Sequence, residues 1–193
     1  MNKSLIIGVI AVIAAVVIFY LWGAGVYNKA VGLQEGVNES WGNVQAAYQR
    51  RADLVPNLVA TVREAAENER GILTQVTEAR AGISKATTPD ELEKAGKQIN
   101  SAINLAFEAY PQIRSTENFQ DLQVQLEGTE NRINVARQEY NGTIKNYNTH
   151  IRGYFTSMAL GWFGKGEVFE PLKGFTATEG AETAPKVDEL FNK

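Results

Sequence analysis

The stretch FQDLQVQLEGTENRINVARQEYNGTIKNYNTHIRGY, residues 119–154, carries the longest regular pattern of side chains in the sequence. Large apolar side chains recur every seven residues, and a column of mostly small or polar side chains follows three residues after each of them. The first column is Phe119, Leu126, Ile133, Tyr140, Tyr147 and Tyr154, and the second is Leu122, Thr129, Ala136, Thr143 and His150. Such a heptad predicts one long helix, and the shortage of leucine in the second column favours packing among other helices over a self-sufficient coiled coil.

Three more helices are predicted upstream of this stretch. Apolar or small residues recur in steps of three and four over residues 26–48 and again over 52–83, which is the pattern of an amphipathic helix. TTPDELEK, residues 87–94, predicts a third start, with Thr88 as N-cap, Pro89 in the first helical position and Glu91 completing a capping box. Ser115 or Thr116 is the expected cap of the fourth helix. Without strand-like alternation in this region, the sequence predicts an all-α fold: an elongated antiparallel four-helix bundle over residues 26–152.

The segment QRRADLVPNLVATV, residues 49–62, places charges and a proline inside this helical pattern. Pro56 removes one helical hydrogen bond and clashes with the carbonyl four residues earlier, so we expect either a kink or a helix restart capped by Asp53. The apolar stripe keeps its phase across the proline, which favours the kink. A polar group of Arg50, Arg51 and Asp53, followed by Asn57, surrounds this position.

Two roles are open for these charges. In the structural one, the guanidinium groups satisfy freed carbonyls and pair with Glu127 or Glu130 of the last helix, which fixes the register of the helices. In the functional one, they form a docking site for a partner or an anionic ligand. We favour the structural role, because burying this group unpaired would cost several kcal/mol.

The N-terminus contains an apolar run, LIIGVIAVIAAVVIFYLW, residues 5–22. Its length suits a transmembrane helix and exceeds the usual core of a cleaved signal peptide, which is the competing interpretation. We therefore expect a single-pass anchor over residues 1–25 in an inner or cytoplasmic membrane, with Gly23 and Gly25 as a hinge. Lys3 and the α-amine before the run, against Lys29 after it, favour an extracytoplasmic domain.

Two apolar surfaces are candidates for contact with a second copy or with the membrane. Gly8, Ala11 and Ala15 lie on one face of the anchor, where small side chains permit close approach of another helix. Residues 153–171 form an aromatic-rich segment, whose Trp162, Phe163 and Phe169 could instead cover the open end of the bundle. Residues 172–193 are expected to be a flexible tail.

Composition and motifs give no support to an enzyme. The net charge of −3 argues against a nucleic-acid-binding surface, and the chain contains one histidine and no cysteine. That histidine, His150, is expected to pack inside the bundle, because no second histidine or cysteine can complete a zinc site with it. No catalytic triad, phosphate-binding loop or Glu-x-x-His di-metal motif occurs, so we expect no catalytic residues, metal or cofactor.

Several of these segments resemble the LemA family. YNKAVGLQEGVNESWGNVQAAYQRRADLVPNLVATV is similar to the family's most recognisable stretch, and LTQVTEARA, YPQIRSTENFQDLQVQLEGTENRINVARQEYN and VFEPL follow in the same order, over about residues 26–172. The resemblance implies a membrane-attached, all-helical protein without a settled enzymatic activity. Many members carry a lipid-anchoring cysteine just before the Tyr-Asn pair, where this chain has GAGVYN, and Phe155 stands where a proline is often found.

These observations lead to two functional hypotheses. The first is a non-enzymatic membrane protein that self-associates into a scaffold, so that its partners are the membrane and further copies of itself. The second is an adaptor or regulator of another membrane protein, such as a quality-control protease, which it would bind through Arg50 and Arg51 or through the tail.

Overall fold

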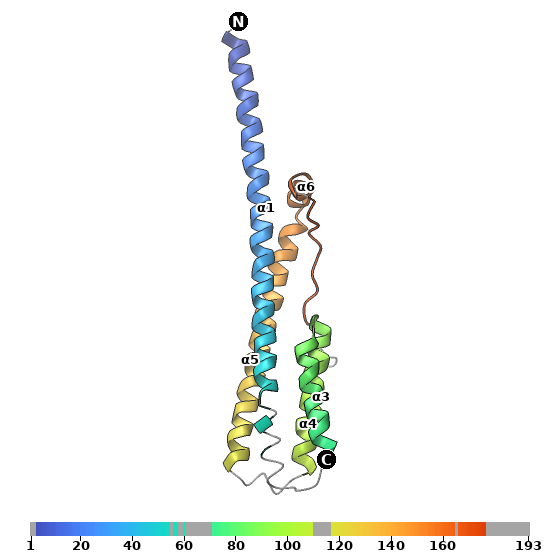
Figure 1. Ribbon diagram of the computed structural model, residues 1–193. Coiled ribbons are helices and arrows are strands. Elements are labelled where there is room, and N and C mark those ends of the chain that lie inside the picture. Colours follow the sequence, from blue (N-terminus) through green and yellow to red (C-terminus); the bar gives the residue numbers. More distant parts are fainter. Residues whose placement is uncertain are drawn as a thin grey trace, which may run out of the picture.

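The regular elements in the described part of the chain are helices (Figure 1). The computed structural model describes residues 3–54, 56, 57, 60, 71–109, 117–164 and 166–176. Within these residues every element is helical: α1 (Lys3–Ala52), α3 (Gly71–Lys85), α4 (Pro89–Ala109), α5 (Glu117–Ile151) and α6 (Tyr154–Phe163). The all-α fold expected from the sequence is therefore confirmed. The expected caps Ser115 and Thr116, and the tail beyond residue 176, lie outside the described residues.

Helix α1 is a single element of 50 residues. At a rise of 1.5 Å per residue it is about 75 Å long. Its N-terminal part projects beyond the other helices (Figure 1) and exposes an apolar segment, residues 5–22, that is long and apolar enough to cross a membrane. The expected hinge at Gly23 and Gly25 is wrong, because the helix continues through both glycines and Gly23 is buried against the ring of Phe163.

Helices α1 and α5 run side by side in opposite directions over most of α5 (Figure 1). The buried positions of α1 include a series spaced by seven: Gly23, Ala30, Val37, Val44 and Arg51. Both predicted columns of α5 are buried up to Ala136. Beyond it the first column stays buried at Tyr140 and Tyr147, whereas in the second column Thr143 and His150 are half-buried and the next residues, Ile144 and Ile151, are buried instead. A straight helix with 3.6 residues per turn drifts away from a seven-residue repeat in this way.

The end of α1 answers the question raised by Pro56. The helix ends at Ala52, and Asp53 and Leu54 form a turn in which the Leu54 amide donates to the Arg51 carbonyl at 3.1 Å. The backbone is helical again at Pro56 and Asn57. The continuous, kinked helix that the sequence favoured is therefore wrong, and the helix breaks at the carbonyl that the proline ring would strike.

Helices α3 and α4 form a hairpin beside the lower parts of α1 and α5 (Figure 1). The predicted start of α4 is confirmed: the Glu91 amide donates to Thr88 Oγ1 at 3.3 Å, and Glu91 Oε2 accepts from the Thr88 amide at 3.3 Å. The apolar face of α4 is buried at Leu92, Ile99 and Ile103. At its far end, the ring of Phe107 meets that of Phe119 on α5, with centroids 4.7 Å apart.

Candidate functional site

The last turn of α1 places a buried cation between helices. Arg51 is only 8% exposed, and its Nη1 donates to Glu130 Oε2 and to the Leu126 carbonyl on α5. Burial lowers the pKa of the Arg51 guanidinium below its usual value, and the Glu130 carboxylate acts in the opposite direction. The pair fixes α1 against α5 at the point where α1 ends.

A second charged group lies next to this pair and joins α5 to α4. Arg137 Nη2 donates to Glu93 Oε2 at 3.2 Å, and Lys97 Nζ lies 2.9 Å from Glu93 Oε1. The ring of Tyr48, on α1, packs against Gly96 so closely that a Cβ there would lie 2.4 Å from Tyr48 Cε1. Burial raises the pKa of the Tyr48 hydroxyl, so this tyrosine stays protonated in the folded protein at neutral pH.

These groups surround a cavity of about 230 Å³ between α1, α4 and α5. Its lining consists of Tyr48, Arg51, Glu93, Gly96, Lys97, Asn100, Glu130, Ile133 and Arg137. Within the described part of the chain, two buried polar atoms at this cavity, Arg51 Nε and Asn100 Oδ1, have no hydrogen-bond partner. The carboxylates are already engaged by cations, so the cluster is built to hold three helices in register.

The polar residues predicted around Pro56 do not form one group. Arg50 is exposed and lines a separate groove between α1 and α5. Asp53 Oδ1 accepts from Gln49 Nε2 at 2.9 Å and from Arg80 Nη2, on α3, at 3.1 Å. Pro56 and Asn57 are exposed. Neighbouring helical positions point about 100° apart, which explains why one arginine is buried and the next faces solvent.

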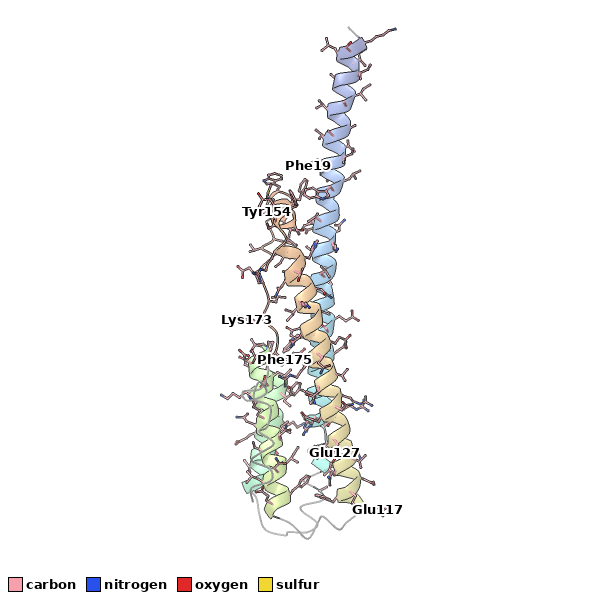
Figure 2. The ribbon with its side chains drawn as sticks, turned by 180° about the vertical axis from the view of Figure 1, so that it is seen from behind. Phe19, Glu117, Glu127, Tyr154, Lys173 and Phe175 are labelled. Atoms are coloured by element: carbon pink, nitrogen blue, oxygen red, sulfur yellow. The ribbon has the colours of Figure 1, made fainter. Side chains whose placement is uncertain are left out.

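The segment after α6 runs back along α5 and is held by two asparagines. Asn148 Nδ2 donates to the Leu172 carbonyl at 2.8 Å and its Oδ1 accepts from the Leu172 amide at 2.9 Å. Asn141 makes the same pair of bonds with Phe175, at 2.9 and 2.8 Å. We call residues 166–176 the strap; Figure 2 shows its Lys173 and Phe175 beside the helices.

The strap ends in a buried aromatic cluster. Phe175 is buried against the rings of Trp41 and Tyr140, with centroids 6.2 and 5.7 Å apart, and Arg137 lies 4.7 Å above its ring. Higher up the strap, Phe169 packs on Tyr27 at 5.9 Å and is half-buried within the chain. Residues 172–176 are thus held in place, so the flexible tail expected from residue 172 onwards is wrong for this part of it.

Helix α6 packs on α1 where the apolar segment ends. The ring of Phe163 lies over Gly23, where a Cβ would be 2.3 Å from the ring, and 5.6 Å from the centroid of Phe19. Trp162 also contacts Phe19, at 5.8 Å, but remains largely exposed. Above this contact, Gly8, Ala11 and Ala15 are exposed. Of the candidate contact residues, Phe163 and Phe169 thus pack against α1 within the chain, whereas the others are exposed: Gly8, Ala11, Ala15 and Trp162.

The sequence model of the LemA family matches residues 40–188. The chain belongs to the LemA family. It is similar to Protein LemA of Metamycoplasma hominis, with 24% identity over 144 residues that cover 72% of this chain and 66% of that relative. It thus spans just under two thirds of the relative's length. The family match contains the polar cluster and the strap, whereas the apolar segment of α1 precedes it.

The remaining candidates for chemistry are engaged in structure. In this LemA-family protein, His150 Nε2–H donates to the Val26 carbonyl at 3.2 Å, which links α5 to α1. Nowhere in the described ranges do three histidine, cysteine, aspartate or glutamate side chains gather in a way that could hold a metal ion.

Sequence reasoning missed the strap entirely. The signal available was Asn141 and Asn148, two amide side chains seven residues apart beside an aromatic column. An amide offers a donor and an acceptor together, which suits recognition of a single extended residue through its backbone. Each asparagine directly follows a tyrosine of the heptad, Tyr140 or Tyr147, and the heptad pattern describes only the buried face of this LemA-family helix. The neighbouring face, which binds the strap, has no periodic pattern of its own.

Proposed function

We propose that this LemA-family protein is a non-enzymatic single-pass membrane protein whose helical domain self-associates into a membrane-associated scaffold. The apolar segment of α1 acts as the anchor. The observation that supports self-association is one continuous face of α1, which is covered by α5 and α6 along the helical domain and left uncovered along the anchor.

This face can be followed along α1 in steps of three and four residues. From buried Ala30 it leads back through Gly23 to Phe19, where α6 packs. The same steps continue to Ala15, Ala11 and Gly8, all exposed, and a Cβ built at Gly8 would have no neighbouring atom within 4 Å. A stripe of small residues lets a second helix approach closely within a membrane. A second anchor would therefore sit directly above α6.

The remaining features of the proposal concern arrangement and orientation. We propose that the α1/α5 pair and the α3/α4 hairpin act together as one elongated antiparallel four-helix bundle, with the ion pair between Arg137 on α5 and Glu93 on α4 joining the two halves. The bundle lies outside the cytoplasm, on the side of the apolar segment opposite to Lys3. No catalytic step, metal or cofactor enters this proposal.

Mass determination by single-particle imaging of the full-length protein in mild detergent tests the scaffold. We expect particles of several subunits, and we expect Gly8→Ile combined with Ala15→Ile to reduce the subunit number because both side chains fill the stripe. Ala14→Ile is the matched control, since position 14 points about 90° away from the centre of the stripe. Wild-type particles of one subunit would refute self-association.

An adaptor role is the second candidate, and one groove favours it. Arg50 and Arg132 border a groove of about 340 Å³ that also exposes Val135, a combination of positive charge and apolar surface suited to an acidic peptide. Arg50→Ala tests this role without disturbing the buried Arg51. A partner that copurifies with the wild-type chain and is lost from Arg50→Ala would favour the adaptor, whereas an unchanged set of partners would count against it.

A further inference from the structure

Helix α6 has apolar side chains on two opposite faces. Its inner face carries Phe163, which packs on α1, together with the buried Ala159 and Leu160. Its outer face consists of four large side chains, Tyr154, Phe155, Met158 and Trp162, all exposed. Aromatic side chains of this kind each present about 150–250 Å² of surface. An apolar patch of such size beside a helix of the same protein calls for a partner.

The position of α6 along α1 identifies the surroundings of this outer face. The rings of Phe19 and Tyr20 contact α6 through Trp162 and Phe163, and Trp22 contacts Phe19 at 5.8 Å. These residues close the apolar segment 5–22, whose 18 residues measure about 27 Å, close to the hydrocarbon thickness of a bilayer. The contact with α6 therefore lies at the membrane–water interface, where tryptophan and tyrosine concentrate.

The polar boundaries of the neighbouring helices lie at the same level. Helix α1 becomes exposed and polar at Asn28 and Lys29, just after the α6 contact. Helix α5 ends at Ile151, and exposed Arg152 precedes the turn at Gly153 into α6. Along the long axis, helix α6 thus lies between these polar residues and the apolar segment of α1. Figure 2 shows the same relation, with Phe19 and Tyr154 at neighbouring levels along the long axis.

The direction of α6 also fits a membrane surface. Figures 1 and 2, taken from opposite sides, both show α6 nearly end-on while α1 runs along the long axis. Helix α6 therefore crosses α1. If α1 spans a bilayer, a helix across it lies along the bilayer plane, which is the orientation of interfacial helices. Two attachments hold α6 there: its packing over Gly23 and the strap that leads from it to Asn148.

We propose that the outer face of α6 inserts into the interfacial layer of the same bilayer that holds the anchor, so that the protein contacts lipid through two elements. The proposal rests on membrane anchoring and is independent of self-association. A second copy is the competing occupant, but continuity with the lipid-facing surface of residues 19–22 favours lipid.

The absence of cysteine in the chain permits a direct test. Phe155→Cys, at a position 68% exposed, is labelled with a nitrobenzoxadiazole fluorophore in the full-length protein reconstituted into phosphatidylcholine vesicles. Val135→Cys on α5 is the matched control in water, since that side chain is 56% exposed. Val12→Cys in the apolar segment reports on the anchor itself.

The expected result is a label at 155 that is shielded from aqueous iodide and quenched several-fold more by lipid carrying a nitroxide near its headgroup than the label at 135. Quenching of the label at 12 by a deep nitroxide establishes insertion of the anchor. If 12 is quenched and 155 behaves like 135, the inference is overturned while the anchor stands. A label at 155 shielded from both iodide and nitroxide also overturns it, because protein then covers the face.

Discussion

Glu130→Gln should destabilise the helical domain more than its place on the surface suggests. The substitution removes the negative charge that compensates Arg51 and leaves a neutral amide that can still accept a hydrogen bond. The Arg51 side chain is only 10% exposed, so its charge is left without a counter-ion in a largely dry environment. Most of the loss in the free energy of unfolding therefore comes from the buried, uncompensated charge of Arg51.

The exposures of the two side chains set the size of the effect. Breaking a fully buried ion pair by removing one partner costs about 3–5 kcal/mol, whereas an exposed pair contributes roughly 0.2–1 kcal/mol. The Glu130 side chain is 45% exposed, which places this pair between the two limits. We expect Glu130→Gln to lower the free energy of unfolding by about 1–3 kcal/mol.

Two further variants make the reasoning testable. Glu127→Gln lies one turn away on α5, where the carboxylate accepts from Gln123, and should change stability by less than about 0.5 kcal/mol. Arg51→Met removes the buried charge and leaves the half-exposed carboxylate to water, so it should cost less than Glu130→Gln. Urea unfolding of the full-length proteins, followed by circular dichroism at a helical wavelength, measures all three. Equal stability of Glu130→Gln and Glu127→Gln would refute the argument.

Three further predictions concern the cap of α4, the packing of α6 and the strap. Hydrogen bonds from Thr87 and Thr88 lower the pKa of Glu91 below 4.5, so its stabilising contribution is present above that pH and is lost as the pH falls through the lowered value; Glu91→Gln should flatten this acid limb in a thermal-melt series. Gly23→Leu should displace α6 and make the chain around Gly164 and Gly166 more accessible to protease. Gly25→Leu should not, because no atom lies within 4 Å of a Cβ built there; equal cleavage of the two variants would contradict the packing of α6 on Gly23. Asn141→Ala should speed hydrogen exchange at the Phe175 amide, which donates to it, with exposed Asn146→Ala as control, and unchanged exchange at Phe175 would contradict the clamp.

The sequence predicted the positions of helices best where apolar side chains recur with a fixed period or where polar side chains cap a helix. The heptad from Phe119 predicted α5 but ran past its end at Ile151, and Thr88 with Glu91 predicted the start of α4, because both patterns act over a few neighbouring residues. The heptad failed at Tyr154, which is 76% exposed, since periodicity does not reveal where a turn at Gly153 ends the helix.

Features that depend on distant partners were harder to predict. Pro56 predicted an irregularity in the helix. Whether the helix bends or ends there depends on the turn at Asp53 and Leu54 and on the contact of Asp53 with Arg80 in α3. Gly23 suggested a hinge by its type, whereas its role is to admit an aromatic ring from a helix about 140 residues later, a contact that local pattern does not encode. Arg51 was placed among the right carboxylates because charge pairing limits the choice of partner.

Because α1 is one uninterrupted helix, it converts a tilt at one end into a sideways displacement of the other. About 30 residues, or roughly 45 Å of helix, separate the end of the apolar segment from Ala52, and the helix has no joint between them. A tilt of about 10° of the apolar segment therefore moves the far end of α1 sideways by roughly 8 Å, an amplification that a flexible linker would not provide. In the membrane-anchored protein that we propose, the reach of the domain over the membrane surface is set by the tilt angle of α1.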